Sequence, residues 1–244
     1  KDGTVVVSDR DGLKFIKDRK IVEKLNRGEK LKNARILNIT ELSDGTMLLG
    51  TDGDGILVMK DKKVRGYIST ESGLSSGVIL RIVKNRRGSG VFVLTGSGIC
   101  FLDEHYTIRE LKGIPYYNNY DLYMNDDGKV FIIGGAGIYC VNYEDFISGR
   151  EDVKAVLLDT KEGLPGSLTS NAWNWVDVNE RLYLSGSNGV YILDTANIEL
   201  NPLILFFDLF SCVSCFLATS TTLSKVEYIY DSLVLVFVLK CLII

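Results

Sequence analysis

The sequence predicts an all-β protein, a partial β-propeller of about five blades, each with four antiparallel strands. The first observation is a repeated unit, in which a short apolar run leads into a small or polar turn that ends in glycine, and a second apolar run follows. The second observation is that these runs are rich in Val, Ile, Leu and Tyr and are only four to six residues long, which is typical of strands rather than amphipathic helices. The third is a lead-in loop that recurs at residues 71–82, 111–123 and 161–175.

The repeat has a period of about forty residues, which is in the range of propeller blades. Its five copies cover residues 5–16, 47–59, 91–102, 130–141 and 182–193. The clearest copy has a turn signal at Asp44-Gly45, a short strand, a second turn at 51–55 and a returning strand. The closing glycines of the five copies are spaced by 43, 43, 39 and 52 residues and are Gly12, Gly55, Gly98, Gly137 and Gly189.

The blades are expected in the following order. Residues 1–34 contain the end of one blade and a charged connector at 17–33, which we interpret as an outer strand and loop rather than a helical turn. Residues 35–70, 71–110 and 111–160 form three successive blades, the last with a longer outer part at 142–155, and residues 161–200 begin another. Because closed propellers have about four to eight blades and the chain begins inside one, we expect a fragment or an arc that needs further sequence to close.

The composition changes after Pro202. Residues 203–244 contain no Gly or Pro and only five charged side chains. Their apolar runs, 203–218 and 233–244, are shorter than the roughly 18 to 20 residues of a membrane-spanning helix. We therefore divide the chain into propeller blades at 1–202 and a hydrophobic tail at 203–244. Three interpretations of the tail stay open: an out-of-frame or mis-assembled terminus, a membrane-associated end, and a divergent pair of strands.

The units resemble the two-component regulator propeller repeat, most closely at 39–59 and 161–193 and in total over residues 1–200. That repeat has a Gly-Leu-Pro lead-in, an Asp-x-x-Gly turn, a strand ending in Gly-Thr and a Tyr-bearing strand. The chain departs from it where the second strand usually carries Trp, since large apolar residues stand there instead, namely Leu48, Phe92, Phe131 and Tyr183. The resemblance implies the extracytoplasmic sensor domain of a bacterial hybrid histidine kinase or diguanylate cyclase.

The composition argues against several classes of function. The formal net charge of −3 and the lack of a basic cluster argue against nucleic-acid binding. The only histidine, His105, falls in a hairpin turn, so no nucleophile–base pair is expected. Cys100 and Cys140 are expected to be small buried residues, and Cys212 and Cys215 lack the further ligands of a zinc site. The Asp-Gly turns at 9–12 and 52–55 do not match a calcium loop. We expect no catalytic residue, no metal and no cofactor.

The remaining candidate is a binding surface. In a propeller blade, the lead-in loop and the turn between the second and third strands lie on one face, and aromatic, amide and hydroxyl groups there suit polar, ring-shaped ligands such as sugars. Trp173 and Trp175 share one face of an inner strand and are expected to pack in the core. The residues 9–11, Ser97, Ser167, Thr169 and Asn188 belong to the same face. Its candidate ligand-binding residues are Tyr116, Tyr117, Asn118, Asn119, Ser75, Ser76, Asp52, Asp54 and Asn171.

We therefore expect a non-catalytic sensor domain, periplasmic or extracytoplasmic, in a membrane-anchored receptor. Its partners would be a carbohydrate or other extracellular ligand and a second copy of the full-length receptor, and its output domain would lie outside this chain. The membrane would be reached through segments outside the chain or through the tail. A protein-interaction scaffold without a small ligand is the first alternative, and a carbohydrate-active propeller enzyme is the second.

Overall fold

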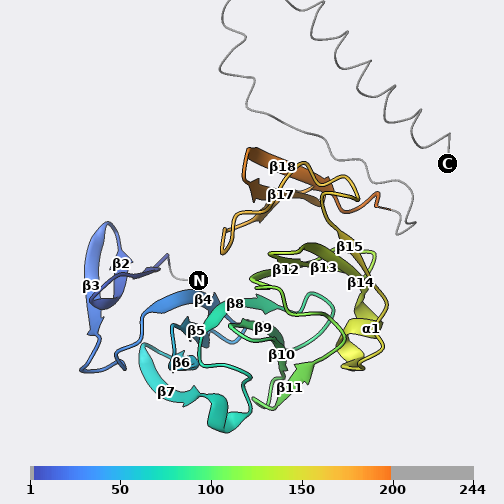
Figure 1. Cartoon of the computed structure of the whole chain (residues 1–244). Coiled ribbons are helices and arrows are strands. Elements are labelled where there is room, and N and C mark those ends of the chain that lie inside the picture. Colours follow the sequence, from blue (N-terminus) through green and yellow to red (C-terminus); the bar gives the residue numbers. More distant parts are fainter. Residues whose placement is uncertain (1–2, 199–244) are drawn as a thin grey trace, which may run out of the picture.

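The computed structural model of the chain describes residues 3–198. Within that range it contains five antiparallel sheets, which follow one another around an arc (Figure 1). Each sheet is one propeller blade, so the predicted all-β propeller is confirmed. The predicted tail, 203–244, lies outside the described residues.

The first two blades have different numbers of strands in the described part of the chain. The first has three, in the order β1-β2-β3, and the second has four, in the order β4-β5-β6-β7. The interpretation of the connector at 17–33 as an outer strand and loop is confirmed, since β3 lies there. The strands are β1 (Val5–Ser8), β2 (Gly12–Lys17), β3 (Lys20–Asn26), β4 (Ile36–Glu41), β5 (Met47–Thr51), β6 (Ile56–Lys60) and β7 (Lys63–Ile68).

The third and fourth blades are also four-stranded, and the fifth has three strands in the described residues. A short 3₁₀ helix at Thr70–Ser72, capped by Ser69, leads into the third blade. The strands are β8 (Ile79–Lys84), β9 (Val91–Thr95), β10 (Ile99–Leu102), β11 (Ile108–Leu111), β12 (Asp121–Met124), β13 (Lys129–Gly134), β14 (Gly137–Asn142), β15 (Ala155–Leu158), β16 (Trp175–Val176), β17 (Arg181–Gly186) and β18 (Gly189–Asp194).

The longer outer part expected at 142–155 contains a helix that the strand pattern did not predict, α1 (Tyr143–Ser148). Asn142 stands at its N-cap position, Glu144 and Asp145 lie in its first turn, and Gly149 ends it in the left-handed conformation. Phe146 is fully buried and stacks on Phe92 of β9, with ring centroids 5.5 Å apart. The helix is therefore part of the contact between the third and fourth blades.

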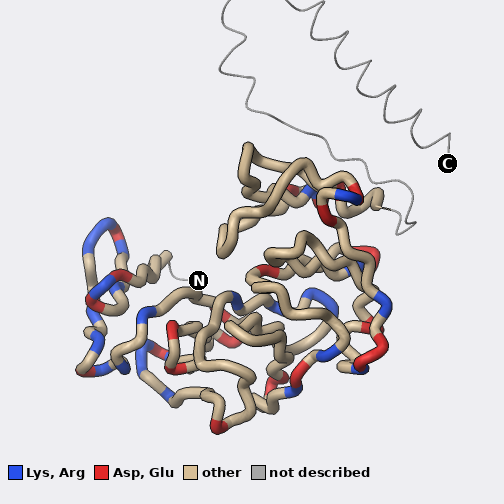
Figure 2. The backbone as a smooth tube through the Cα atoms, viewed as in Figure 1, with Lys and Arg blue, Asp and Glu red and all other residues tan. Residues whose placement is uncertain are grey.

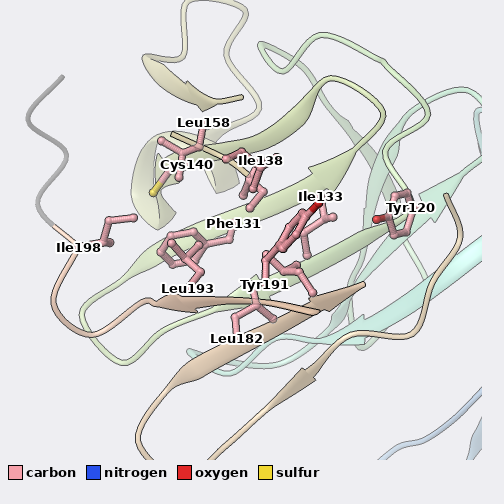
Figure 3. Packing of buried hydrophobic residues seen from close by; sticks show 12 residues of the cluster. Tyr120, Phe131, Ile133, Ile138, Cys140, Leu158, Leu182, Tyr191, Leu193 and Ile198 are labelled. Carbon is pink, nitrogen blue, oxygen red and sulfur yellow. The ribbon is translucent and has the colours of Figure 1, made fainter. Parts of the chain in front are cut away.

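The core is divided into four apolar clusters, each between two successive blades. Alternate residues of one strand belong to different clusters: Val91 and Val93 of β9 face the second blade, whereas Phe92 and Leu94 face the fourth. Both faces of a middle blade are thus buried, which explains why its strands are continuous apolar runs. Figure 3 shows the cluster between the fourth and fifth blades, where Phe131, Tyr191 and Leu193 meet.

The inner strands β4, β8 and β12 lie on the concave side of the arc, and β7, β11 and α1 lie outside (Figure 1). The chain's charges are spread over turns and outer strands, with many lysines and arginines on the hairpin of β2 and β3 (Figure 2). No helix within residues 3–198 has both the length and the apolar character to cross a membrane.

Candidate functional site

The lead-in loops and the turns between second and third strands gather on one face of the arc, as predicted. Backbone hydrogen bonds join them: Gly53 N–H donates to the carbonyl of Gly77 at 3.1 Å, and Ser187 N–H donates to that of Ser167 at 2.9 Å. The Ser97 hydroxyl likewise donates to the Ser75 carbonyl at 2.8 Å. We call this surface the loop face.

The tyrosine segment of the loop face is only partly available to a ligand. Tyr116 is 39% exposed, but its hydroxyl donates to the carbonyl oxygen of Gly96 at 2.6 Å. Tyr117 is 58% exposed, and Asn118 beside it is exposed in the left-handed conformation, with a φ of 51°. Asn119 is 1% exposed and donates to the carbonyl of Pro115 at 3.0 Å. The buried Asn119 side chain therefore stabilises the loop through this hydrogen bond and is not part of the surface that a ligand could reach.

The two predicted serines both have hydrogen-bond partners, that of Ser75 at the end of β9 and that of Ser76 within its own loop. The Ser75 hydroxyl lies 2.8 Å from that of Thr95, and the Ser76 hydroxyl accepts from Val78 N–H at 3.1 Å. Asn171 is exposed, with a φ of 57°. The serines thus shape the loop face, while Asn171 presents its amide to solvent.

The predicted aspartates lie in the turn between β5 and β6 of the second blade. Asp52 forms an ion pair with Arg35 at 2.7 Å, and Asp54 accepts a hydrogen bond from Ala34 N–H at 3.2 Å. Both line an open pocket of about 890 Å³ with the connector at 28–34 and Tyr67. Both aspartates thus take these polar partners from residues 34 and 35 rather than from the tyrosine segment.

The expectation that both tryptophans pack in the core is wrong. Trp173 is 69% exposed and Trp175 is 62% exposed. Trp173 precedes β16 in the lead-in loop, outside the sheet, and its ring lies on the guanidinium of Arg81, 3.6 Å from the ring centroid. Trp175 begins a strand of only two residues and packs on one side against Tyr183, 5.1 Å between centroids. Each indole is thus covered on one side only, because β16 is too short to enclose Trp175 and Trp173 lies outside it.

Inner strands of the third and fourth blades and the lead-in loop of the fifth bring together a group of polar and aromatic side chains, of which three are buried and Trp173 is exposed. We call this group the axial cluster. Its members are Arg81, Tyr120, Asp121, Trp173 and Asn174.

The ion pair of the axial cluster joins two blades. Nε of Arg81 lies 3.3 Å from Oδ1 of Asp121, although its N–H is not directed well enough for a hydrogen bond. Arg81 also donates to the carbonyl of Ala172 at 2.8 Å, and Asn174 donates to Oδ2 of Asp121 at 2.9 Å. Burial raises the pKa of Asp121, and the Arg81 charge and the Asn174 amide oppose that rise.

The predicted site residues do not include Arg81, Tyr120, Asp121 or Asn174. A signal was available, because Arg81 stands inside the apolar run ILRIVK and Asp121 opens the run DLYM. A charge within an inner strand is costly unless it is paired, so each predicts a partner. Which partner it meets depends on the order of the blades.

The reactive residue types lie apart from these groups. His105 is an exposed turn residue, with 81% of its side chain accessible, as predicted. Cys100 and Cys140 are free and fully buried, also as predicted, and burial raises the pKa of Cys140 to about 12. No group of three or more His, Cys, Asp or Glu that could hold a metal occurs between residues 3 and 198.

Solved structures with a similar fold include extracellular domains of two-component systems and a lyase. The extracellular domains of the hybrid two-component systems BT3049 and BT4673 of B. thetaiotaomicron match with TM-scores of 0.63 and 0.61 and identities of 15% and 18%. The matches cover 85% and 80% of this chain, but only 28% and 27% of those chains. A virginiamycin B lyase of Staphylococcus aureus, described as inactivated by a histidine-to-alanine substitution, matches at 0.54 and 16% identity, over 81% of this chain and 69% of that one.

No protein-family profile matches the chain. No curated protein matches it either. At identities below 20%, the matches to solved structures show the fold. The chain thus has the propeller fold of the extracellular domains of hybrid two-component systems, in agreement with the resemblance of its repeats, and spans about a quarter of their length.

Proposed function

We propose that this chain is a non-catalytic sensor portion of an extracytoplasmic, membrane-anchored receptor. It recognises a polar, ring-shaped ligand such as a saccharide at the loop face and passes the signal to an output domain outside this chain. The observation that carries the proposal is the gathering of lead-in loops on one face, where Tyr117 and Asn118 are exposed side by side.

Two further observations support a binding role over a catalytic one. The fold occurs in extracellular domains of two-component systems, where the chain corresponds to 27–28% of the domain. The lyase with the same fold loses activity when one histidine is replaced, whereas His105 here lies in the β10–β11 turn, away from the loop face. A carboxylate or amide beside an exposed tyrosine ring suits recognition of hydroxyl-rich rings.

The test is binding of the full chain to an array of neutral and acidic oligosaccharides, followed by calorimetry on the best ligand. We expect Tyr117→Ala to weaken binding by about tenfold or more, as for an aromatic anchor. Tyr106→Ala is the matched control, because Tyr106 is also an exposed tyrosine, at 43%, but lies in the β10–β11 turn. Unchanged affinity in Tyr117→Ala, or equal loss in both variants, would contradict the proposal.

The same preparation separates the alternatives. Saccharide binding without release of a shortened product supports a sensor, and cleavage of the bound oligosaccharide identifies an enzyme. A chain that binds no saccharide but captures another protein is a scaffold. Receptor dimerisation belongs to the proposal as well, and light scattering of the full-length receptor with and without ligand measures it.

A further inference from the structure

Trp173 presents one face of its indole to solvent while the other is occupied. Its ring covers the Arg81 guanidinium at 3.6 Å, yet the residue remains 69% exposed. The guanidinium beneath it is fixed by Asp121 and the Ala172 carbonyl, so the ring is held in place rather than free to rotate. A large aromatic surface held this way is a platform on which a flat apolar face can stack.

Beside the platform, hydrogen-bonding groups are left unused. Nε of Arg81, the hydroxyl of Tyr120 and Oδ1 of Asn174 are all inaccessible and accept or donate no hydrogen bond among residues 3–198, although Nε of Arg81 stands in the ion pair with Asp121. Arg81 is 5% exposed and Tyr120 only 1%. Burial raises the pKa of Tyr120 to about 12, so its hydroxyl keeps its proton. Unpaired buried polar atoms cost free energy, and three in one place indicate a partner that supplies both donors and acceptors.

The charge of the axial cluster is balanced. Arg81 is its only cation and Asp121 its only anion, and the two are paired. An anionic ligand would compete with Asp121 for the guanidinium and bring a second negative charge near a buried carboxylate. The cluster therefore favours an uncharged ligand.

We propose that the axial cluster is a binding subsite for an uncharged sugar ring. The inference deepens the proposed sensing function and rests on it for the ligand class. The C–H face of the ring stacks on the exposed side of Trp173. After a small opening of the loop that carries Trp173, hydroxyl groups of the ring donate to Oδ1 of Asn174 and accept from Nε of Arg81. The Tyr120 hydroxyl donates to or accepts from a further hydroxyl of the ring. Because the subsite joins three blades, its occupation tightens the fifth blade against the third and fourth.

The chain offers a direct optical probe, because Trp173 and Trp175 are its only tryptophans. In the full chain carrying Trp175→Phe, emission reports on Trp173 alone. Titration with neutral hexasaccharides of glucose, mannose and xylose is compared with hexagalacturonate as the anionic probe. We expect a saturable change in emission with at least one neutral probe and none with hexagalacturonate. Asn174→Ala should weaken that binding by about tenfold, the effect of one lost hydrogen bond in a desolvated site.

The controls separate this inference from the proposed function. Trp173→Phe keeps a smaller platform and should retain part of the affinity on an oligosaccharide array, whereas Trp173→Ala should lose it while thermal unfolding remains cooperative. Array binding that Tyr117→Ala abolishes but Trp173→Ala leaves intact overturns the axial subsite and leaves the proposed function standing. Preference for hexagalacturonate, or no response of Trp173 to any neutral probe, also overturns it.

Discussion

At the scale of single residues, three of the five repeat glycines meet the backbone of the last strand of their own blade, namely β3, β7 or β15. A Cβ on Gly55 would lie 2.1 Å from the carbonyl oxygen of Ile68, and the same contact occurs at Gly12 and Gly137. All three have positive φ, 79° at Gly55. Gly189 has open space around it instead, in a blade whose described part has no fourth strand. At Gly12, Gly55 and Gly137, glycine is thus required by the close approach of the last strand.

We predict that Gly55→Ala destabilises the protein by about 2 kcal/mol or more, since it adds a steric clash to left-handed strain. Gly66→Ala is the control, because Gly66 lies in β7 with no positive φ and nothing within 4 Å of an added Cβ. Urea unfolding measures both variants. An equal midpoint for Gly55→Ala and the wild-type chain would show that the strands can move apart at no cost.

The buried carboxyl group of Asp121 should make the stability of the protein depend on pH. Burial raises its pKa above the ordinary 3.8, so the folded protein binds this proton more readily than the unfolded chain. Charged Asp121 therefore lowers stability, and the wild-type chain should gain stability relative to Asp121→Asn as the pH falls through the folded pKa toward 3.8. The measurement is the difference in free energy of unfolding between the two proteins across pH. A difference that moves toward the wild-type chain as the pH rises would contradict the assignment.

At the scale of elements, the fourth blade has the helix α1 between its two outer strands, β14 and β15. The one fully buried residue of α1 is Phe146, which contacts Phe92 of the third blade. Tyr143 of the same helix also lies next to Phe92, with 6.5 Å between the ring centroids. A helix of six residues is marginal by itself, so tertiary packing of Phe146 stabilises it.

Phe146→Ala should destabilise the protein by about 3 to 5 kcal/mol, as for other buried aromatic truncations. Glu144→Ala in the first turn of α1 is exposed and should change stability by less than about 1 kcal/mol. Thermal unfolding followed by circular dichroism gives both values. A small effect of Phe146→Ala would mean that the outer edge refills the space without α1.

At the scale of the whole molecule, the four apolar clusters connect the blades in series. Polar contacts reinforce the same neighbours: Asn38 accepts from Ile82 N–H at 3.2 Å between the second and third blades, and Asn125 donates to the Thr195 carbonyl at 2.7 Å between the fourth and fifth. Stability in such an arrangement is approximately a sum of terms between neighbours.

Leu184→Ala should therefore loosen the fifth blade first. Leu184 is fully buried in the cluster shared by the fourth and fifth blades, and its truncation costs about 2 to 5 kcal/mol. Hydrogen exchange followed by mass spectrometry should show faster exchange in β17 and β18 and less change in β4 to β7. A uniform increase over the whole chain would show instead that the blades unfold as one unit.

The order of residues along the chain was enough to predict the blade boundaries, the closing glycines, the buried cysteines and the exposed turn of His105. These features depend on local backbone conformation and on the pattern of apolar residues along one strand, and both can be read from neighbouring positions in the sequence. Tertiary structure alone decided that Arg81 meets Asp121 and that Trp173 is exposed on top of the guanidinium. It also decided that Asn119 is buried and Tyr117 is not. Those outcomes depend on which blades become neighbours at the axis, and residues 40 to 90 positions apart carry no local signal of that approach.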